Sequence, residues 1–149
     1  MSFWQWLQNN QEKPETKQLS LNLGNQNQSN KPLPIKHQKV DGAIVNRDFR
    51  KAIHHKGGDE QCQIDSSVAM SQELFDTNPR QLYKQAGGKA YQRSTLPKEA
   101  QKAFIVGETI ATHDLNEKEI LKQSQHELNR EITNTVRNSG KKARKLFPW

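Results

Sequence analysis

The sequence lacks several features that mark common protein classes. With one cysteine, Cys62, in 149 residues, it can form neither an internal disulfide nor a four-thiolate metal site. No apolar run approaches the roughly 20 residues that span a bilayer. The segment after Met1 lacks the basic start and long apolar stretch of a signal peptide. We therefore predict a cytoplasmic protein, and a hydrophobic content of only 32% predicts a small folded core.

Residue patterns of known catalytic and metal sites are also scarce. Gly87-Gly88 stands alone and is typical of a helix stop rather than a phosphate loop. No sequence pattern indicates a general base that would activate a cysteine or serine nucleophile. We predict a non-enzymatic protein without cofactor or metal. A small hydrolase stays open as an alternative, with His113 and Asp114 beside Glu108 doing acid–base work if a pocket buries them. One group of possible metal ligands has a spacing that matches no closed zinc pattern: His54, His55, Asp59, Glu60 and Cys62.

Positive charge is what the chain has in excess. Lys and Arg outnumber Asp and Glu by 23 to 16, which gives a formal net charge of +7. Such a surplus favours partners that carry phosphate or carboxylate groups, such as nucleic acid, anionic lipid or an acidic protein. The same charge can also serve solubility alone. The sequence leaves the oligomeric state open.

The first 39 residues differ from the rest. They are rich in Asn and Gln and are interrupted by prolines, so they offer little apolar surface to offset the entropy cost of ordering. We predict a mostly disordered tail over residues 1–39. Phe3, Trp4 and Leu7 can share one face of a helical turn. They would dock on a partner or a membrane surface, or pack on the chain's own domain.

Residues 40–140 show helical periodicity, and no segment shows the β-branched alternation of a strand. The pattern predicts an all-α domain of about five helices. Predicted stops are Gly57-Gly58, Gly87-Gly88 and Gly140. The predicted N-caps are Asn46, Asp65 or Ser66, Asn78 before Pro79, and Asp114 or Asn116.

The last two predicted helices differ in their apolar faces. The helix that begins near Pro97 has a broad face, which places it at the centre of the core. The helix after it has a narrow stripe, so it packs along one edge only. The broad face consists of Ala100, Ala103, Phe104, Gly107 and Ala111, and the narrow stripe of Leu121, Leu128, Ile132 and Val136.

The C-terminus carries the clearest functional pattern. No acidic residue follows Glu131, so the cations beyond it form a local positive field that nucleic-acid phosphates would satisfy. Phe147 and Trp149 can stack on unpaired bases. A basic last turn also suits the negative end of a helix dipole, and Phe147 can fold back into the core. The predicted phosphate-binding residues in this basic–aromatic tail region are Arg137, Lys141, Lys142, Arg144 and Lys145.

A second pattern lies between Ser66 and Ala86, where two short helices meet at a tight turn. The outline is that of a helix-turn-helix. Arg80, Gln81 and Lys84 near the start of the second helix would then reach base edges in a major groove. Helical hairpins are also common in proteins that do not bind DNA.

A family resemblance rests on several short segments of the second half. They are Leu82-Tyr83, Gly87-Gly88, Val106-Gly107-Glu108-Thr109 and His126-Glu127-Leu128-Asn129-Arg130, with Ile132, Val136, Arg137, Gly140 and Pro148 following. They resemble the C-terminal region of damage-inducible protein D, a bacterial and phage family linked to BRO-type antirepressors. The resemblance covers under half of the chain, and residues 1–70 do not look like the BRO-type domain with which that family begins. It implies a stress- or phage-associated regulator of the DNA damage response, acting near DNA or on the RecA recombinase.

These observations lead to two hypotheses of different classes. The first is a non-enzymatic nucleic-acid-associated regulator with a helical domain over 40–140 and a phosphate-contacting tail over 141–149. The second is a protein-interaction factor, an adaptor or antagonist, that docks through its aromatic ends.

Overall fold

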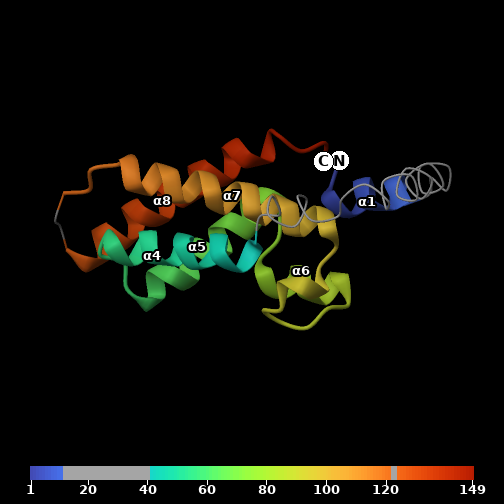
Figure 1. The fold of residues 1–149 in the computed structure, drawn as a ribbon, viewed down its shortest axis with the longest axis horizontal. Coiled ribbons are helices and arrows are strands. Elements are labelled where there is room, and N and C mark those ends of the chain that lie inside the picture. Colours follow the sequence, from blue (N-terminus) through green and yellow to red (C-terminus); the bar gives the residue numbers. More distant parts are fainter. Residues whose placement is uncertain (12–40, 122–123) are drawn as a thin grey trace, which may run out of the picture. The chain divides into compact units, whose positions relative to one another are not determined.

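The computed structural model describes residues 1–11, 41–121 and 124–149 (Figure 1). Every regular element in these ranges is a helix, so the all-α prediction is confirmed. The chain divides into two compact units, residues 1–41 with Trp149 and residues 42–148. None of the helices described is long and apolar enough to cross a membrane.

The first unit contains helix α1, Phe3–Gln11. Ser2 begins it with a capping box: the Ser2 hydroxyl accepts a hydrogen bond from the Gln5 amide at 3.3 Å, and the Gln5 side chain accepts one from the Ser2 amide at 3.2 Å. Phe3 and Leu7 are buried. The prediction of disorder from residue 1 is therefore wrong for α1, because a local cap and an apolar face order it. The rest of the predicted tail, residues 12–40, lies outside the described residues.

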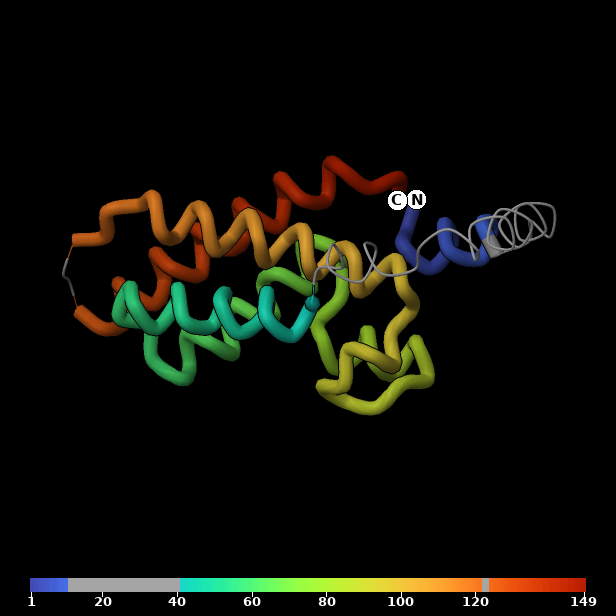
Figure 2. Tube along the Cα trace, in the orientation of Figure 1, coloured from blue at the N-terminus to red at the C-terminus, as the bar shows by residue number. Residues whose placement is uncertain are grey.

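The second unit contains five α-helices, as predicted. Figures 1 and 2 show α4, α5, α7 and α8 running beside one another, with α6 and the loop after it at one end. Within this group α8 packs on both α5 and α7, and α7 also packs on α4. The elements are α4 Gly42–His55, α5 Glu60–Phe75, α6 Pro79–Ala86, the short 3-10 helix η1 Arg93–Thr95, α7 Lys98–Glu117 and α8 Gln125–Arg144.

The predicted ends of α6 are confirmed. The Asn78 side chain accepts a hydrogen bond from the Gln81 amide at 2.9 Å, Pro79 opens the helix, and Gly87 ends it with a left-handed φ of 67°. The turn before α6 contains no glycine. Asp76 takes the left-handed conformation there instead, with φ of 58°.

Three other predicted N-caps are wrong. Helix α4 begins at Gly42 rather than after Asn46. Helix α5 begins earlier than Asp65 or Ser66 because the Asp59 carboxylate accepts a hydrogen bond from the Cys62 amide at 2.9 Å. Helix α8 uses Ser124, whereas the predicted caps Asp114 and Asn116 lie inside α7.

The predicted core helix is confirmed, whereas the stripe of the last helix needs correction. All five residues of the broad face of α7 are buried. In α8, Ile132 and Val136 are buried, but Leu121 precedes the helix and is 71% exposed. Further along, the buried side of α8 continues with small residues, Ser139, Gly140 and Ala143. Small side chains allow a neighbouring helix to come close.

Gly140 does not end α8, because it lies at the closest approach of α8 to α5. A Cβ atom there would lie 2.9 Å from the Cβ of Glu73 and 3.4 Å from the Sδ of Met70. Gly107 of α7 faces the same methionine, where a Cβ would lie 2.7 Å from Sδ. Met70 is therefore held between two helices at positions where only glycine fits without displacement.

Gly140→Ala provides a test of this packing. In an ordinary helix interior the change stabilises by about 1 kcal/mol. Here we expect destabilisation of about 1–3 kcal/mol, because the added methyl group overpacks the contact with Glu73. Asn134→Ala, at an exposed position of the same helix, is the control and should change the free energy of unfolding by less than about 0.5 kcal/mol. Urea denaturation of both variants measures the difference, and a more stable Gly140→Ala protein would contradict the packing.

Candidate nucleic-acid interface

Two of the predicted phosphate-binding residues hold α8 against the end of α5. The Arg137 guanidinium lies 3.0 Å from the Glu73 carboxylate. Arg144 donates to the backbone carbonyls of Glu73 and Leu74 at 3.2 and 3.1 Å and pairs with Asp76 at 3.1 Å. It thus caps the negative end of the α5 dipole. These two arginines are compensated by acids distant in sequence.

Lys142 is also paired, in this case with α7. Its ammonium lies 3.0 Å from the Asp114 carboxylate, which also accepts a hydrogen bond from Ser139 at 2.7 Å. Burial raises the pKa of Asp114, but Ser139 and Lys142 outweigh burial and leave the pKa below its usual value. The carboxylate therefore stays ionised at neutral pH and offsets the Lys142 charge.

The side of α8 opposite its buried residues presents a different set of side chains to solvent, next to Arg137. Three cations and two amides share it, and we call this set the α8 stripe. All five residues are exposed. Within the described parts of the chain, no carboxylate lies within ion-pair distance of a stripe cation. The α8 stripe consists of Arg130, Asn134, Asn138, Lys141 and Lys145.

Sequence reasoning found two of the five stripe residues and missed three. Lys141 and Lys145 are among the predicted phosphate contacts. Arg130 was missed because it precedes Glu131 and so lies outside the stretch without acidic residues. Asn134 and Asn138 were missed because they carry no charge. The spacing of the five by four, four, three and four residues repeats at the helical period and was the available indication.

The predicted stacking residues are covered to different degrees. Phe147 is half-buried, and Trp149 is 8% exposed. In the first unit the Trp149 ring packs edge-on against Phe3, with centroids 4.7 Å apart, and lies 5.0 Å from the Trp6 ring. Trp4 is half-buried and stacks edge-on with Phe3. Phe3 and Trp4, two of the three residues predicted to dock on a partner, thus belong to one aromatic cluster with Trp149, in which Phe3 is fully buried.

The predicted recognition helix is present as α6. Its side chains Arg80, Gln81 and Lys84 are all exposed, while Leu82 and Tyr83 face the core. Helix α6 packs on α5 across the three-residue turn. The helix has only eight residues, so it offers a shorter contact surface than the 20 residues of α8.

The carboxylate proposed for a hydrolase has a structural partner. Glu108 is 1% exposed, and Arg93 binds both its oxygens, at 2.5 and 2.7 Å. Asn46 of α4 donates a further hydrogen bond to it at 2.9 Å. The Arg93 guanidinium also stacks on the Phe104 ring, 4.2 Å from its centroid. Glu108 therefore joins α4, η1 and α7.

The acid–base group of the hydrolase alternative is not brought together. Asp114 bonds to Ser139 and Lys142, away from the partners of Glu108, and His113 is exposed. Neither of two surface depressions in the described structure is lined by Glu108, His113 or Asp114.

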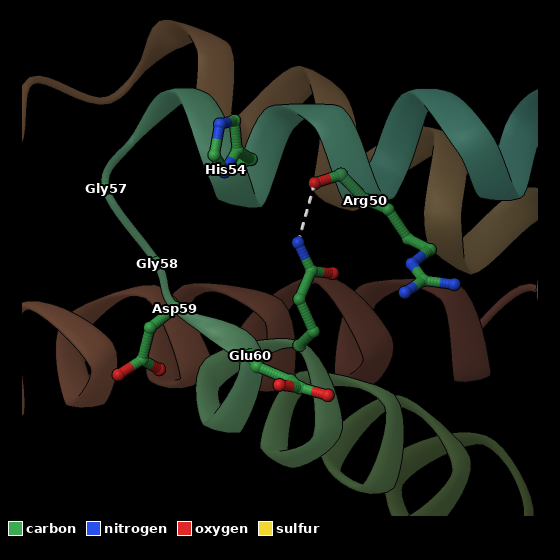
Figure 3. Close-up of a pocket in the computed structure, with 7 residues that line it drawn as sticks. Arg50, His54, Gly57, Gly58, Asp59 and Glu60 are labelled. Carbon is green, nitrogen blue, oxygen red and sulfur yellow. Dashed lines mark hydrogen bonds between the residues drawn. The ribbon is translucent and has the colours of Figure 1, made fainter.

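The possible metal ligands near the α4–α5 linker are dispersed. Figure 3 shows His54, Asp59 and Glu60 around an open depression, with their side chains pointing apart. Cys62 is buried nearby, and burial raises its pKa, so the thiol stays protonated. No group of three potential ligands able to hold a metal ion occurs among the residues that the structure describes.

Comparison with known proteins gives no relative. No protein family, no curated protein and no solved structure matches the chain.

Glu108→Ala tests the structural role of the buried pair. The change leaves the Arg93 charge partly buried without its carboxylate, so we expect the free energy of unfolding to fall by about 3 kcal/mol. Glu117→Ala removes an exposed carboxylate from the same helix and should cost less than about 0.5 kcal/mol. Thermal unfolding followed by circular dichroism compares the two. Equal stability of the two variants would show that the pair does not hold the helices together.

Proposed function

We propose that the protein is a non-enzymatic, nucleic-acid-associated regulator that contacts phosphates through the α8 stripe. The observation that carries the proposal is the stripe itself, where Arg130, Lys141 and Lys145 are exposed and have no carboxylate within ion-pair distance in the described chain. Three unneutralised cations on one helix face create a field that polyanions relieve by releasing counterions. The cytoplasm, where nucleic acid is accessible, is the proposed location.

Some of the phosphate-binding residues predicted from the sequence have carboxylate partners and others do not, which reduces the set of contact residues that we propose. Arg137, Lys142 and Arg144 are bound to Glu73, Asp114 and Asp76. In each case a carboxylate within 3.1 Å offsets the charge of the cation. Lys141 and Lys145 have no such carboxylate in the described chain. The resemblance to damage-inducible protein D agrees with a regulator that works near DNA or on a recombinase. We include this role in the proposal.

A second candidate function is protein docking through the aromatic ends. The observation in its favour is the indole N–H of Trp4, which is buried without a hydrogen-bond partner in the described structure. A buried donor without an acceptor is costly, and a partner's carbonyl would satisfy it. Against this, the apolar residues that would anchor a partner, Phe3, Leu7 and Trp149, are already covered.

Charge removal on the stripe provides the main test. The triple variant Arg130→Gln, Lys141→Gln, Lys145→Gln should bind labelled nucleic acid at least about tenfold more weakly near physiological salt. It should also lower the slope of log K against log [salt] by about 2 to 3, because each lost phosphate contact contributes roughly 0.9. Fluorescence anisotropy titrated against NaCl measures both quantities.

A matched control distinguishes the effect of the stripe cations from the effect of lowering the total charge of the protein. Arg47→Gln, Lys51→Gln, Lys98→Gln removes three exposed cations from α4 and α7, and we expect it to leave the salt slope nearly unchanged. Equal losses in both triple variants would indicate a diffuse charge effect and reject the stripe. Loss only in Arg80→Gln, Lys84→Gln would move the contact to α6.

A further inference from the structure

The order of side chains along the α8 stripe is as informative as its charge. Arg130 stands at one end, Asn134 and Asn138 occupy the middle, and Lys141 and Lys145 stand at the other end. At about 100° per residue, the five positions fall within an arc of about 80°. After Glu127, which is exposed on the same side one turn before Arg130, this side of the helix presents cation, amide, amide and cation in sequence.

The spacing of the end cations is somewhat larger than the width of the major groove of duplex DNA. Arg130 and Lys141 are eleven residues apart, which corresponds to about 16 Å along the axis at about 1.5 Å per residue. The major groove of B-form DNA is about 12 Å wide and admits an α-helix. If α8 lay obliquely in that groove, the cations at its two ends would reach phosphates of opposite strands, and the two amides would face the base edges.

The two central asparagines are available for such contacts. Asn129, one turn earlier, is already engaged: its amide donates to Asp59 at 2.8 Å and its carbonyl accepts from Gln125 at 2.8 Å. Asn134 and Asn138 are exposed, and neither makes a side-chain hydrogen bond within the described parts of the chain. A carboxamide pairs through one donor and one acceptor with N7 and N6 of adenine in the major groove.

Other nucleic acids fit the stripe less well. Single strands are held by exposed aromatic rings that stack on the bases, and the α8 stripe contains no aromatic residue. The major groove of an RNA duplex is deep and narrow, so side chains on a helix do not reach its bases. Charge, spacing and amide chemistry together favour B-form DNA.

We propose that α8 is a DNA-reading helix that enters the major groove of B-form DNA, with Asn134 and Asn138 contacting adenine. This inference rests on the proposed function and specifies its partner. Arg130, Lys141 and Lys145 supply affinity that does not depend on sequence, and the two asparagines supply preference among sequences.

The test uses the full chain and three probes of the same sequence: a DNA duplex, its single strand and the corresponding RNA duplex. A preferred DNA site is first selected from a randomised duplex pool. We expect the DNA duplex to bind about tenfold or more tightly than the other two probes. We expect the selected sites to be enriched in A·T pairs, as the amide contacts require.

Three variants then test the reading residues, two double variants and one control. Asn134→Ala, Asn138→Ala should reduce the ratio of selected-site to random-duplex affinity by about tenfold or more while leaving the salt slope unchanged. Asn116→Ala, at an exposed position of α7, should leave that ratio as it is. Since Asn134 and Asn138 are exposed, circular dichroism should show folding intact. The second double variant, Asn134→Ser, Asn138→Ser, keeps small polar side chains but removes the carboxamides. It should lower the same affinity ratio.

The outcomes distinguish the DNA-reading helix from the more general proposal that the α8 stripe binds phosphates. Equal affinity for the three probes, or an unchanged ratio in both double variants, would overturn the DNA-reading helix and leave phosphate binding in place. If no probe bound even at low salt, both proposals would be rejected. Tight DNA binding with sequence preference lost only in the double variants would establish the inference.

Discussion

The close approach of α8 to α5 is the contact on which the rest of this structure depends. It requires the absence of a side chain at Gly140, because a Cβ atom would lie 2.9 Å from that of Glu73. With the helices so close, Arg137 reaches Glu73, and Arg144 reaches the carbonyl end of α5. Dispersion contacts around Met70 and these charged hydrogen bonds then stabilise the same interface.

This interface also sorts the charges of α8. Cations beside α5 and α7 acquire carboxylate partners, whereas Arg130, Lys141 and Lys145 lie on the solvent side, where no acid of the described chain pairs with them. Because Arg137, Lys142 and Arg144 each have a carboxylate partner, the cations of α8 without one in the described chain lie on a single face of the helix. A single packing arrangement thus gives α8 one side that is buried and one solvent-facing side whose cations have no carboxylate partner in the described chain.

The sequence predicted the fold class, the number of α-helices described in the second unit and the apolar face of α7, because these depend on local periodicity, but it did not predict α1. It also predicted the ends of α6, where Asn78, Pro79 and Gly87 act through neighbouring backbone atoms. It failed at Gly140, since a glycine that permits close packing and one that ends a helix look alike in sequence. The ion pairs of Arg137, Lys142 and Arg144 could not be predicted from the sequence either. Their partners Glu73, Asp114 and Asp76 lie 64, 28 and 68 residues away in the chain, respectively.

The most direct measurement is a titration of the ¹⁵N-labelled full chain with a B-form DNA duplex, followed by NMR. We predict that chemical-shift changes concentrate on the solvent face of α8, including the side-chain amides of Asn134 and Asn138, and disappear at high salt. Changes centred on α6 or on the aromatic cluster of Phe3 and Trp149, or no changes at low salt, would contradict it.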